Sequence, residues 1–236
     1  MKRRIVLTVL ALCLAIGFSL LGRWQLGREQ QKRDQLAEAA AALSAPPVAL
    51  SQAIARGQGR AGGIDRVQAS GRFLPSPRLL LDNQRRGDRV GVRLYCVFAS
   101  EAGESLLADL GWLPLPGDRV LPAAPCPSGL QSVSGLLVPP PAVGLRLGPA
   151  QVAQDDGERW LATRVEPVEL ATAWQRPLAG RVLRLDPALP IGHERDLELL
   201  SNTLPPEKHR GYAIQWFGLA LATLVITLVL NLRRRP

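Results

Sequence analysis

The two ends of this 236-residue chain limit its fold more than anything between them. Ile5 to Leu21 is a run of 17 residues without a charged side chain, and Ala213 to Leu230 is a second run of 18. An α-helix rises about 1.5 Å per residue, so each run would span about 26 Å, close to the bilayer's hydrocarbon core of about 30 Å. We therefore predict transmembrane helices over residues 5–22 and 212–231, with a water-exposed domain between them.

A cleaved signal peptide is the alternative for the first run, because three cations at residues 2–4 precede it. The run is longer than the apolar region of an ordinary signal peptide, and the chain continues with LLGRW instead of an Ala-x-Ala-like cleavage site. The letters LALC, ending at Cys13, resemble a lipoprotein site, but too few apolar residues precede that cysteine. We expect an uncleaved anchor.

The net charge of +9 is concentrated at the two ends of the chain. Without the three cations before the first apolar run and the three after the second, 23 basic residues face 20 acidic ones, which gives no basic stripe for a nucleic acid. Cations flanking membrane spans favour the cytoplasmic side, although four more cations follow the first run closely. We expect a multi-pass protein of the bacterial inner membrane, with residues 1–4 and 232–236 in the cytoplasm and residues 23–211 in the periplasm.

The composition between the apolar runs predicts an α+β domain. Residues 23–43 hold many strong helix formers and no proline, which indicates a helical extension of the first span that stops before Pro46 and Pro47. Short β-compatible runs follow, separated by Gly, Pro, Asp and Asn: 67–73, 79–83, 90–99, 105–113, 132–138 and 182–185. The letters SEAGES at 100–105 predict a hairpin turn, and 166–174 predicts a short helix. The expected fold is therefore mainly antiparallel β with one or two helices.

Neither the cysteines nor any catalytic motif indicates an enzyme. Cys13 lies inside the first apolar run, and Cys96 and Cys126 are 30 residues apart with no CxxC motif. A disulfide between these two in an oxidising compartment stays open, whereas a thiol-based metal or redox site is not expected. GxSxG, HExxH, a P-loop and a dinucleotide fingerprint are all missing from the sequence.

Polar and aromatic residues mark the same edge of both predicted spans. Aromatic side chains at headgroup depth form the interfacial belt of membrane proteins, and this belt would explain the aromatic residues. It does not explain the two glutamines, because an unbonded amide is costly at the edge of a span. We expect Gln25 and Gln215 to meet across a helix pair or to contact a ligand. The set comprises Trp24, Gln25 and Arg28 after the first span and Tyr212, Gln215 and Trp216 at the second.

His209 allows two interpretations. It is either a solvated histidine between Lys208 and Arg210, or an imidazole ligand for a metal or haem iron. Haem is an apolar plate with two carboxylates, so a membrane edge next to cations suits it. His193, in a loop after Gly192, is expected to be exposed polar filler.

Five motifs in this order resemble the Surfeit locus protein 1 family. They are GRWQLGREQQK (22–32), SGRF (70–73), LDNQ (81–84), ADLGWLP (108–114) and KHRGYAIQWFGLA (208–220). The resemblance covers nearly the whole chain and implies a role in the assembly of haem-copper oxidases, chiefly cytochrome c oxidase. Leu110-Gly111-Trp112 departs from the family's Arg-Gly-Trp, and the stretch 83–87 is looser than the family's pattern.

The resemblance implies a non-enzymatic assembly factor that binds haem a through His209 and assists its delivery to the large membrane subunit of the oxidase. Trp24, Gln25, Arg28, Tyr212, Gln215 and Trp216 would line or orient the site. Other assembly factors and the lipid bilayer are the further partners expected, and no other cofactor is expected. The alternative is a scaffold that stabilises an oxidase intermediate without binding a cofactor. An unrelated enzyme or sensor is a third hypothesis, which the lack of a catalytic constellation disfavours.

Overall fold

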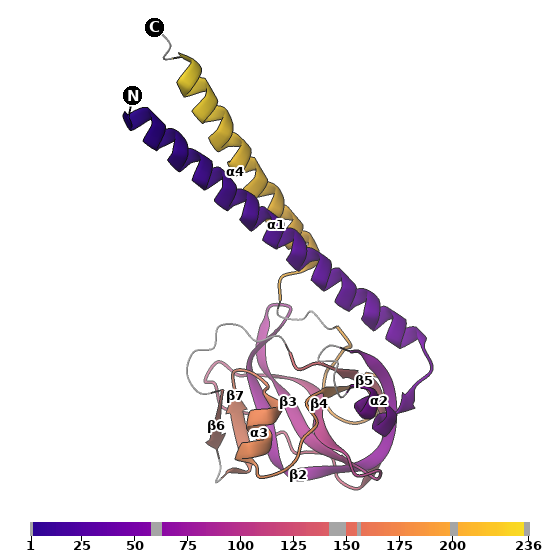
Figure 1. Ribbon diagram of the computed structural model, residues 1–236. Helices are drawn as coiled ribbons and strands as arrows, with labels where there is room; N and C mark the ends of the chain where they lie inside the picture. The colour runs from indigo at the N-terminus through magenta and orange to yellow at the C-terminus, as the bar shows by residue number, and fades with distance from the viewer. Residues whose placement is uncertain (1, 58–62, 142–149, 155–156, 199–202, 234–236) are drawn as a thin grey trace. The chain divides into compact units, whose positions relative to one another are not determined.

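The chain forms two compact units (Figure 1). In the computed structural model, one unit pairs the first 37 residues with residues 203–236, and the other comprises residues 38–202. The structure describes residues 2–57, 63–141, 150–154, 157–198 and 203–233, so the end of the predicted basic tail lies outside the described residues. We call the two parts the helix pair and the sheet unit.

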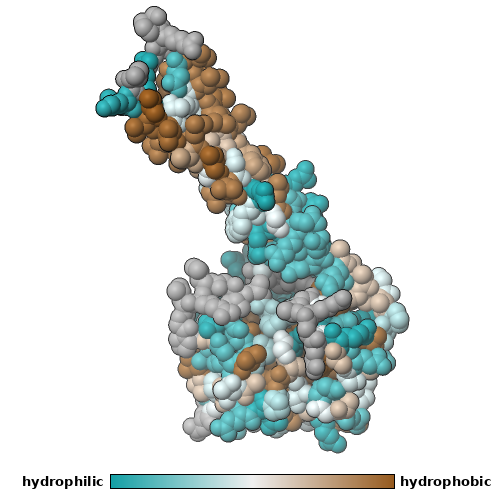
Figure 2. Space-filling view, in the orientation of Figure 1, coloured by the Kyte–Doolittle hydropathy of each residue, from teal (hydrophilic) through white to brown (hydrophobic). Residues whose placement is uncertain are grey.

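The helix pair consists of α4, Pro206–Arg233, and the part of α1, Lys2–Ser44, that lies within the first 37 residues. Both helices are long and apolar enough to cross a membrane, as the two apolar runs predict. Hydrophobic side chains cover much of the helix pair's surface (Figure 2). α1 continues without a break beyond residue 22, and two prolines follow shortly after its end at Ser44.

The two helices meet along one stripe of side chains, which we call the seam. Its residues recur at alternating intervals of three and four, the spacing of knobs-into-holes packing. At one end Asn231 Nδ2 donates to Thr8 Oγ1 at 3.3 Å, and near the middle the rings of Phe18 and Trp216 stack with centroids 5.7 Å apart. The buried or half-buried seam positions are Thr8, Ala11, Ala15, Phe18, Gly22, Gln25, Glu29 and Lys32 on α1, and Pro206, His209, Ala213, Trp216, Ala220, Thr223 and Thr227 on α4.

The sheet unit is a mixed, mainly antiparallel sheet, which confirms the predicted strand-rich domain. The sheet closes into a ring through the pairings β2–β3, β3–β4, β4–β8, β8–β5 and β5–β2. Strands β7 and β6 extend the sheet from β2. The strands are β1 Val48–Ala49, β2 Asp65–Arg86, β3 Arg89–Ser100, β4 Ser105–Pro114, β5 Leu130–Val138, β6 Gln151–Gln154, β7 Arg159–Ala162 and β8 Val182–Leu185. The short helices are α2 Leu50–Gly57 and α3 Pro167–Ala173.

The long strand β2 differs from the two separate strands that the sequence predicts. Pro75 and Pro77 indicate a break, because proline cannot donate a hydrogen bond to a neighbouring strand. In the structure, both prolines lie in a register shift between Phe73 and Arg78, and the pairing of β2 with β3 resumes beyond it. An irregularity of this kind is the position within a sheet where proline is tolerated.

Alternation along the strands places two cores on opposite faces of the sheet. On β3, Leu94, Cys96 and Phe98 belong to the main core, whereas Tyr95 and Val97 belong to a second core. Leu50 and Ala53 of α2 join the main core, and Leu170 of α3 joins the second. Side chains along β3 therefore alternate between the two faces of the sheet, as the geometry of a β-strand requires.

Gly71 lies where β2 pairs with two neighbours at once, opposite Gln131 of β5 and Ser100 of β3. A Cβ atom at this position would lie 2.3 Å from the carbonyl oxygen of Ala99. Backbone cannot move aside as a flexible side chain can, so only glycine fits this crossing.

We predict that Gly71→Ala lowers the free energy of unfolding of the sheet unit by about 1–3 kcal/mol or more, because the added methyl group overlaps backbone. Gly180→Ala is the control, since a Cβ atom there meets nothing within 4 Å. Urea unfolding of the full chain in detergent measures both variants. Equal midpoints for the two variants would contradict the close approach at Gly71.

The structure settles the question left open for the cysteines. Cys96 and Cys126 form a disulfide that closes a loop of 30 residues, and Cys126 brings the proline-rich segment after β4 against the main core. A cross-link of this kind stabilises a fold chiefly by restricting the unfolded chain.

We predict that Cys96→Ala with Cys126→Ala lowers the free energy of unfolding by about 2–4 kcal/mol. Cys13→Ala removes the free cysteine on α1 and serves as the matched control. The measurement is the urea midpoint of the full chain without reductant. A double variant as stable as the Cys13→Ala control would show that the cross-link contributes nothing.

Candidate functional site

The seam becomes polar toward one end of the helix pair, where α4 begins. There Gln25, Glu29 and Lys32 of α1 share the seam with His209 of α4, and we call these four residues the polar end. Glu29 is 8% exposed, Lys32 6% and His209 7%. Buried charges and imidazoles are rare unless they have partners, so the partners of these groups define what the site can do.

The central contact of the polar end joins the two helices. His209 Nδ1 and Gln25 Oε1 lie 2.7 Å apart, a hydrogen-bond distance. Burial, followed by the charges of Lys32 and Arg28, holds the pKa of His209 below its ordinary value, and Glu29 acts in the opposite direction. The imidazole is therefore biased toward its neutral form, which is the form that binds a metal.

The two buried charges beside His209 each have a partner. Lys32 Nζ donates to Thr203 Oγ1 at 2.8 Å, and burial together with the charge of Arg28 lowers the pKa of Lys32. Glu29 Oε1 pairs with Arg33 Nη2 at 2.7 Å. The polar end is therefore a connected set of contacts that involves both helices and Thr203, just before α4.

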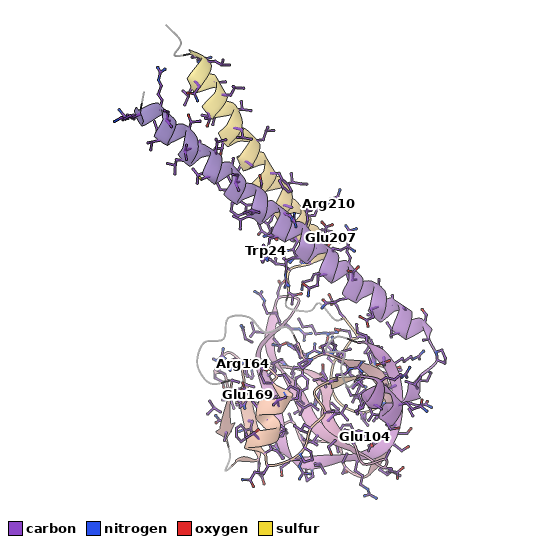
Figure 3. All side chains as sticks on the ribbon, in the orientation of Figure 1. Trp24, Glu104, Arg164, Glu169, Glu207 and Arg210 are labelled. Atoms are coloured by element: carbon purple, nitrogen blue, oxygen red, sulfur yellow. A yellow bond between two sulfur atoms is a disulfide. The ribbon has the colours of Figure 1, made fainter. Side chains whose placement is uncertain are left out.

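The structure separates the other predicted site residues into two groups. Trp216 lies in the seam against Phe18, whereas Trp24 and Tyr212 are 57% and 41% exposed and Gln215 is exposed as well. Trp24 and Arg210 lie toward the same end of the helix pair (Figure 3). Gln25 is bonded to His209, so the first expectation for the two glutamines, a contact between them, is not what the structure shows, and contact with a ligand stays a prediction.

Sequence reasoning missed three members of the seam near this site. Phe18 lies outside the five motifs, whereas Glu29 and Lys32 lie within the motif at 22–32 but were not predicted as site residues. Their spacing from Gly22 and Gln25, in steps of three and four, was the signal that could have identified them. Arg28 lies beside this stripe, and its Nη1 donates to Gln31 Oε1 at 2.6 Å.

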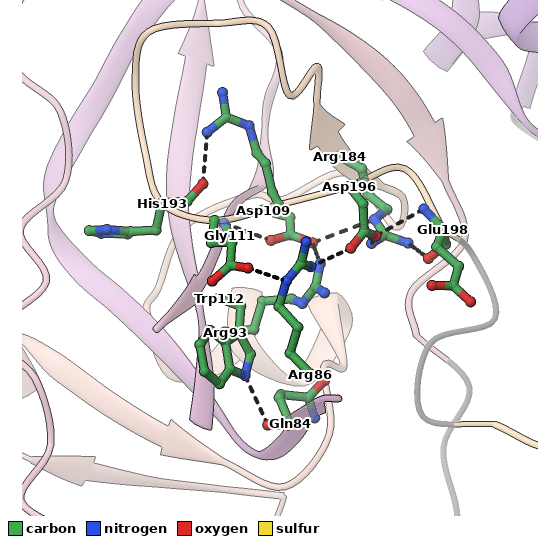
Figure 4. A network of polar contacts seen from close by, with 12 residues as sticks. Gln84, Arg86, Arg93, Asp109, Gly111, Trp112, Arg184, His193, Asp196 and Glu198 are labelled. Carbon is green, nitrogen blue, oxygen red and sulfur yellow. Dashed lines mark hydrogen bonds and ion pairs between the residues drawn. The ribbon is translucent and has the colours of Figure 1, made fainter. Parts of the chain in front are cut away.

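A second polar cluster lies within the sheet unit (Figure 4). Asp109 of β4, 3% exposed, accepts a hydrogen bond from Arg93 Nη1 of β3 at 2.7 Å, and Arg184 Nε of β8 lies 3.6 Å from the same carboxylate oxygen. All three residues are buried. Three adjacent strands therefore share one carboxylate between two guanidinium groups.

The same cluster fastens the segment 193–198 to the sheet (Figure 4). Arg184 Nη2 lies 3.5 Å from Asp196, and Arg86 contacts both Asp196 and Glu194. Burial alone would raise the pKa of Asp196, but the hydrogen bond from Arg86 and the nearby guanidinium charges hold it below its ordinary value. The backbone N–H of Trp112 also donates to the carbonyl oxygen of Glu194 at 2.7 Å.

Neither cluster forms a metal centre by its side chains alone. Among the described residues, no group of three or more His, Cys, Asp or Glu side chains is arranged to hold a metal ion.

Comparison with protein families decides the assignment. The SURF1 family model matches residues 12–221, which run from α1 through the sheet unit into α4. The chain belongs to the SURF1 family. SURF1 proteins are oxidase assembly factors and not an enzyme family, and the resemblance seen in the motifs is confirmed. No curated protein matches the chain.

The departure from the usual SURF1 motif has a structural setting. Leu110 stands where the motif resemblance implies arginine, and its side chain is fully buried in the main core. Gly111 follows with a φ of +110°, and a Cβ atom there would lie 2.8 Å from the carbonyl oxygen of His193. His193 contributes its backbone to this contact, since its N–H donates to the carbonyl oxygen of Leu110 at 2.7 Å.

We predict that Asp109→Asn destabilises the sheet unit by about 3–5 kcal/mol, because it leaves two buried guanidinium groups without their shared countercharge. Asp88→Asn, in the exposed turn between β2 and β3, is the control. Chemical unfolding of the full chain in detergent compares them. A loss below about 1 kcal/mol for Asp109→Asn would show that Asp196 alone neutralises the cluster.

Proposed function

We propose that this SURF1 protein crosses the bacterial inner membrane twice and binds haem a at the polar end of the helix pair, for delivery to the large membrane subunit of a haem-copper oxidase. The observation that carries the proposal is the buried contact between His209 and Gln25 next to a cluster of cations. The cationic termini support a cytoplasmic location for both chain ends, which would place the sheet unit in the periplasm.

The donor set at the polar end fits a haem. Gln25 occupies Nδ1 of His209, and within the described residues no hydrogen bond reaches Nε2, so this second nitrogen is the one that would bind iron. Arg28, Lys208 and Arg210 supply positive charge for the haem carboxylates, and the two residues on α4 are exposed. Haem would be the cargo of this site, because one protein ligand permits release to an acceptor with a stronger ligand set.

The exposed residues at the same end of the helix pair would then contact what surrounds the haem site. Trp24 and Tyr212 present rings at the edge of the predicted spans, where aromatic side chains suit the headgroup layer. Gln215 presents an amide on the α4 surface, which would require a hydrogen-bonding partner inside the membrane. A helix of the oxidase subunit, or the cargo itself, would supply that partner.

A scaffold that binds no cofactor is the second candidate, and one observation favours it. His209 is only 7% exposed and already joins the two helices through Gln25. A purely structural imidazole would have the same contacts. The sheet unit would then act by docking on an oxidase intermediate.

Two substitutions of His209 separate these functions. His209→Gln keeps a side chain that can hydrogen-bond Gln25 but removes the imidazole, whereas His209→Ala removes both. We expect both variants, expressed in cells that make haem a and purified in detergent, to lose most of the haem retained by the parent. The measurement is the absorption spectrum per mole of protein.

His193→Ala is the matched control, because the chain has two histidines. It should retain haem as the parent does. If His209→Gln and His209→Ala both keep the parent's haem content and spectrum, His209 is not an axial ligand. If the parent carries no haem and His209→Gln still supports oxidase assembly, the scaffold is the correct function.

A further inference from the structure

We propose that Gln25 is a positioning residue that holds the proton of His209 on Nδ1 and thereby makes Nε2 the ligating nitrogen. The proposal rests on haem binding at His209 and specifies which atom binds and what orients it. A neutral imidazole carries one N–H, and the other nitrogen holds the lone pair that a metal requires. The group opposite each nitrogen therefore decides which of them can act as a ligand.

The contact with Gln25 restricts the orientation of the His209 ring more than water would restrict a solvated histidine. Gln25 Oε1 lies 2.7 Å from His209 Nδ1, and the two residues face each other across the seam from different helices. Carbonyl oxygen only accepts hydrogen bonds, so this contact requires the proton on Nδ1. Rotation of the ring would break the contact and leave a buried polar group unpaired, which is costly.

The charges around the ring act on its protonation. Lys32 and Arg28 both act on His209 as cations, and Glu29 acts as the opposing anion. The same two cations oppose protonation of both ring nitrogens at once.

This arrangement is the one that metal-binding histidines commonly use. The ring nitrogen remote from the metal donates to a fixed oxygen, which sets the tautomer and the ring plane, and loss of such a partner costs about 10–100-fold in affinity. Gln25 would have that role here. It would contact the imidazole and not the haem, so its effect would pass through His209.

The first test needs no haem. Nitrogen-15 NMR of the detergent-solubilised full chain, labelled at histidine and carrying His193→Ala, reports the protonation of each nitrogen of His209. We expect a neutral ring with the proton on Nδ1 in the parent, and a mixed or reversed population in Gln25→Leu. Gln25→Glu keeps an oxygen acceptor and should retain the Nδ1 proton.

The second test titrates the same proteins with haem. Gln25→Leu should bind haem about 10–100-fold more weakly, and Gln25→Glu should stay much closer to the parent. A proton on Nε2 in the parent, or the same tautomer population in Gln25→Leu as in the parent, would overturn the proposal. Haem retention that survives His209→Ala would refute haem ligation by His209 itself, whichever tautomer the spectra show.

Discussion

Close packing along the seam is the constraint on which the candidate site depends. Two helices in lipid gain little from the hydrophobic effect, so they associate through small residues and hydrogen bonds. The seam has both: Ala15 and Ala220 are each 5% exposed, and polar pairs lie toward its two ends. Because steps of three and four residues keep one face of each helix in contact, the same register that packs these alanines also buries His209 against Gln25.

In the sheet unit, buried charged side chains fix the position of a neighbouring segment of the chain. Along β3, β4 and β8, side chains alternate between the inside and the outside of the closed ring of strands. Those on the outside include Arg93, Asp109 and Arg184. A buried ion cluster adds little net stability but penalises any arrangement that leaves a charge unpaired. Here the cluster specifies where the segment 193–198 lies on the sheet, through Asp196 and the backbone contact of Trp112.

The fold was largely predictable where local chemistry decides it. Uncharged runs predict the two terminal helices, β-compatible runs bounded by turn residues predict the strands on either side of the SEAGES turn, and the segment 166–174 predicts α3. Contacts between distant residues were not predictable from local pattern. The chain around Pro75 looks like a strand end, and only the bulge pairing with β3 shows that β2 continues. Likewise, His209 and Gln25 are both visible in the sequence, but their contact depends on the register between two helices that are far apart in the chain.

The most direct test of the account is a cross-link across the seam. The register set by Phe18 with Trp216 and by Gln25 with His209 places Ala15 beside Ala220. In a Cys13→Ala background, Ala15→Cys with Ala220→Cys should oxidise to a disulfide within one chain, identified by mass spectrometry of the linked peptides. The outward pair Ile16→Cys with Leu221→Cys, 60% and 63% exposed in the parent, should not. Cross-linking of the outward pair in place of the seam pair would contradict the register, and with it the burial of His209 against Gln25.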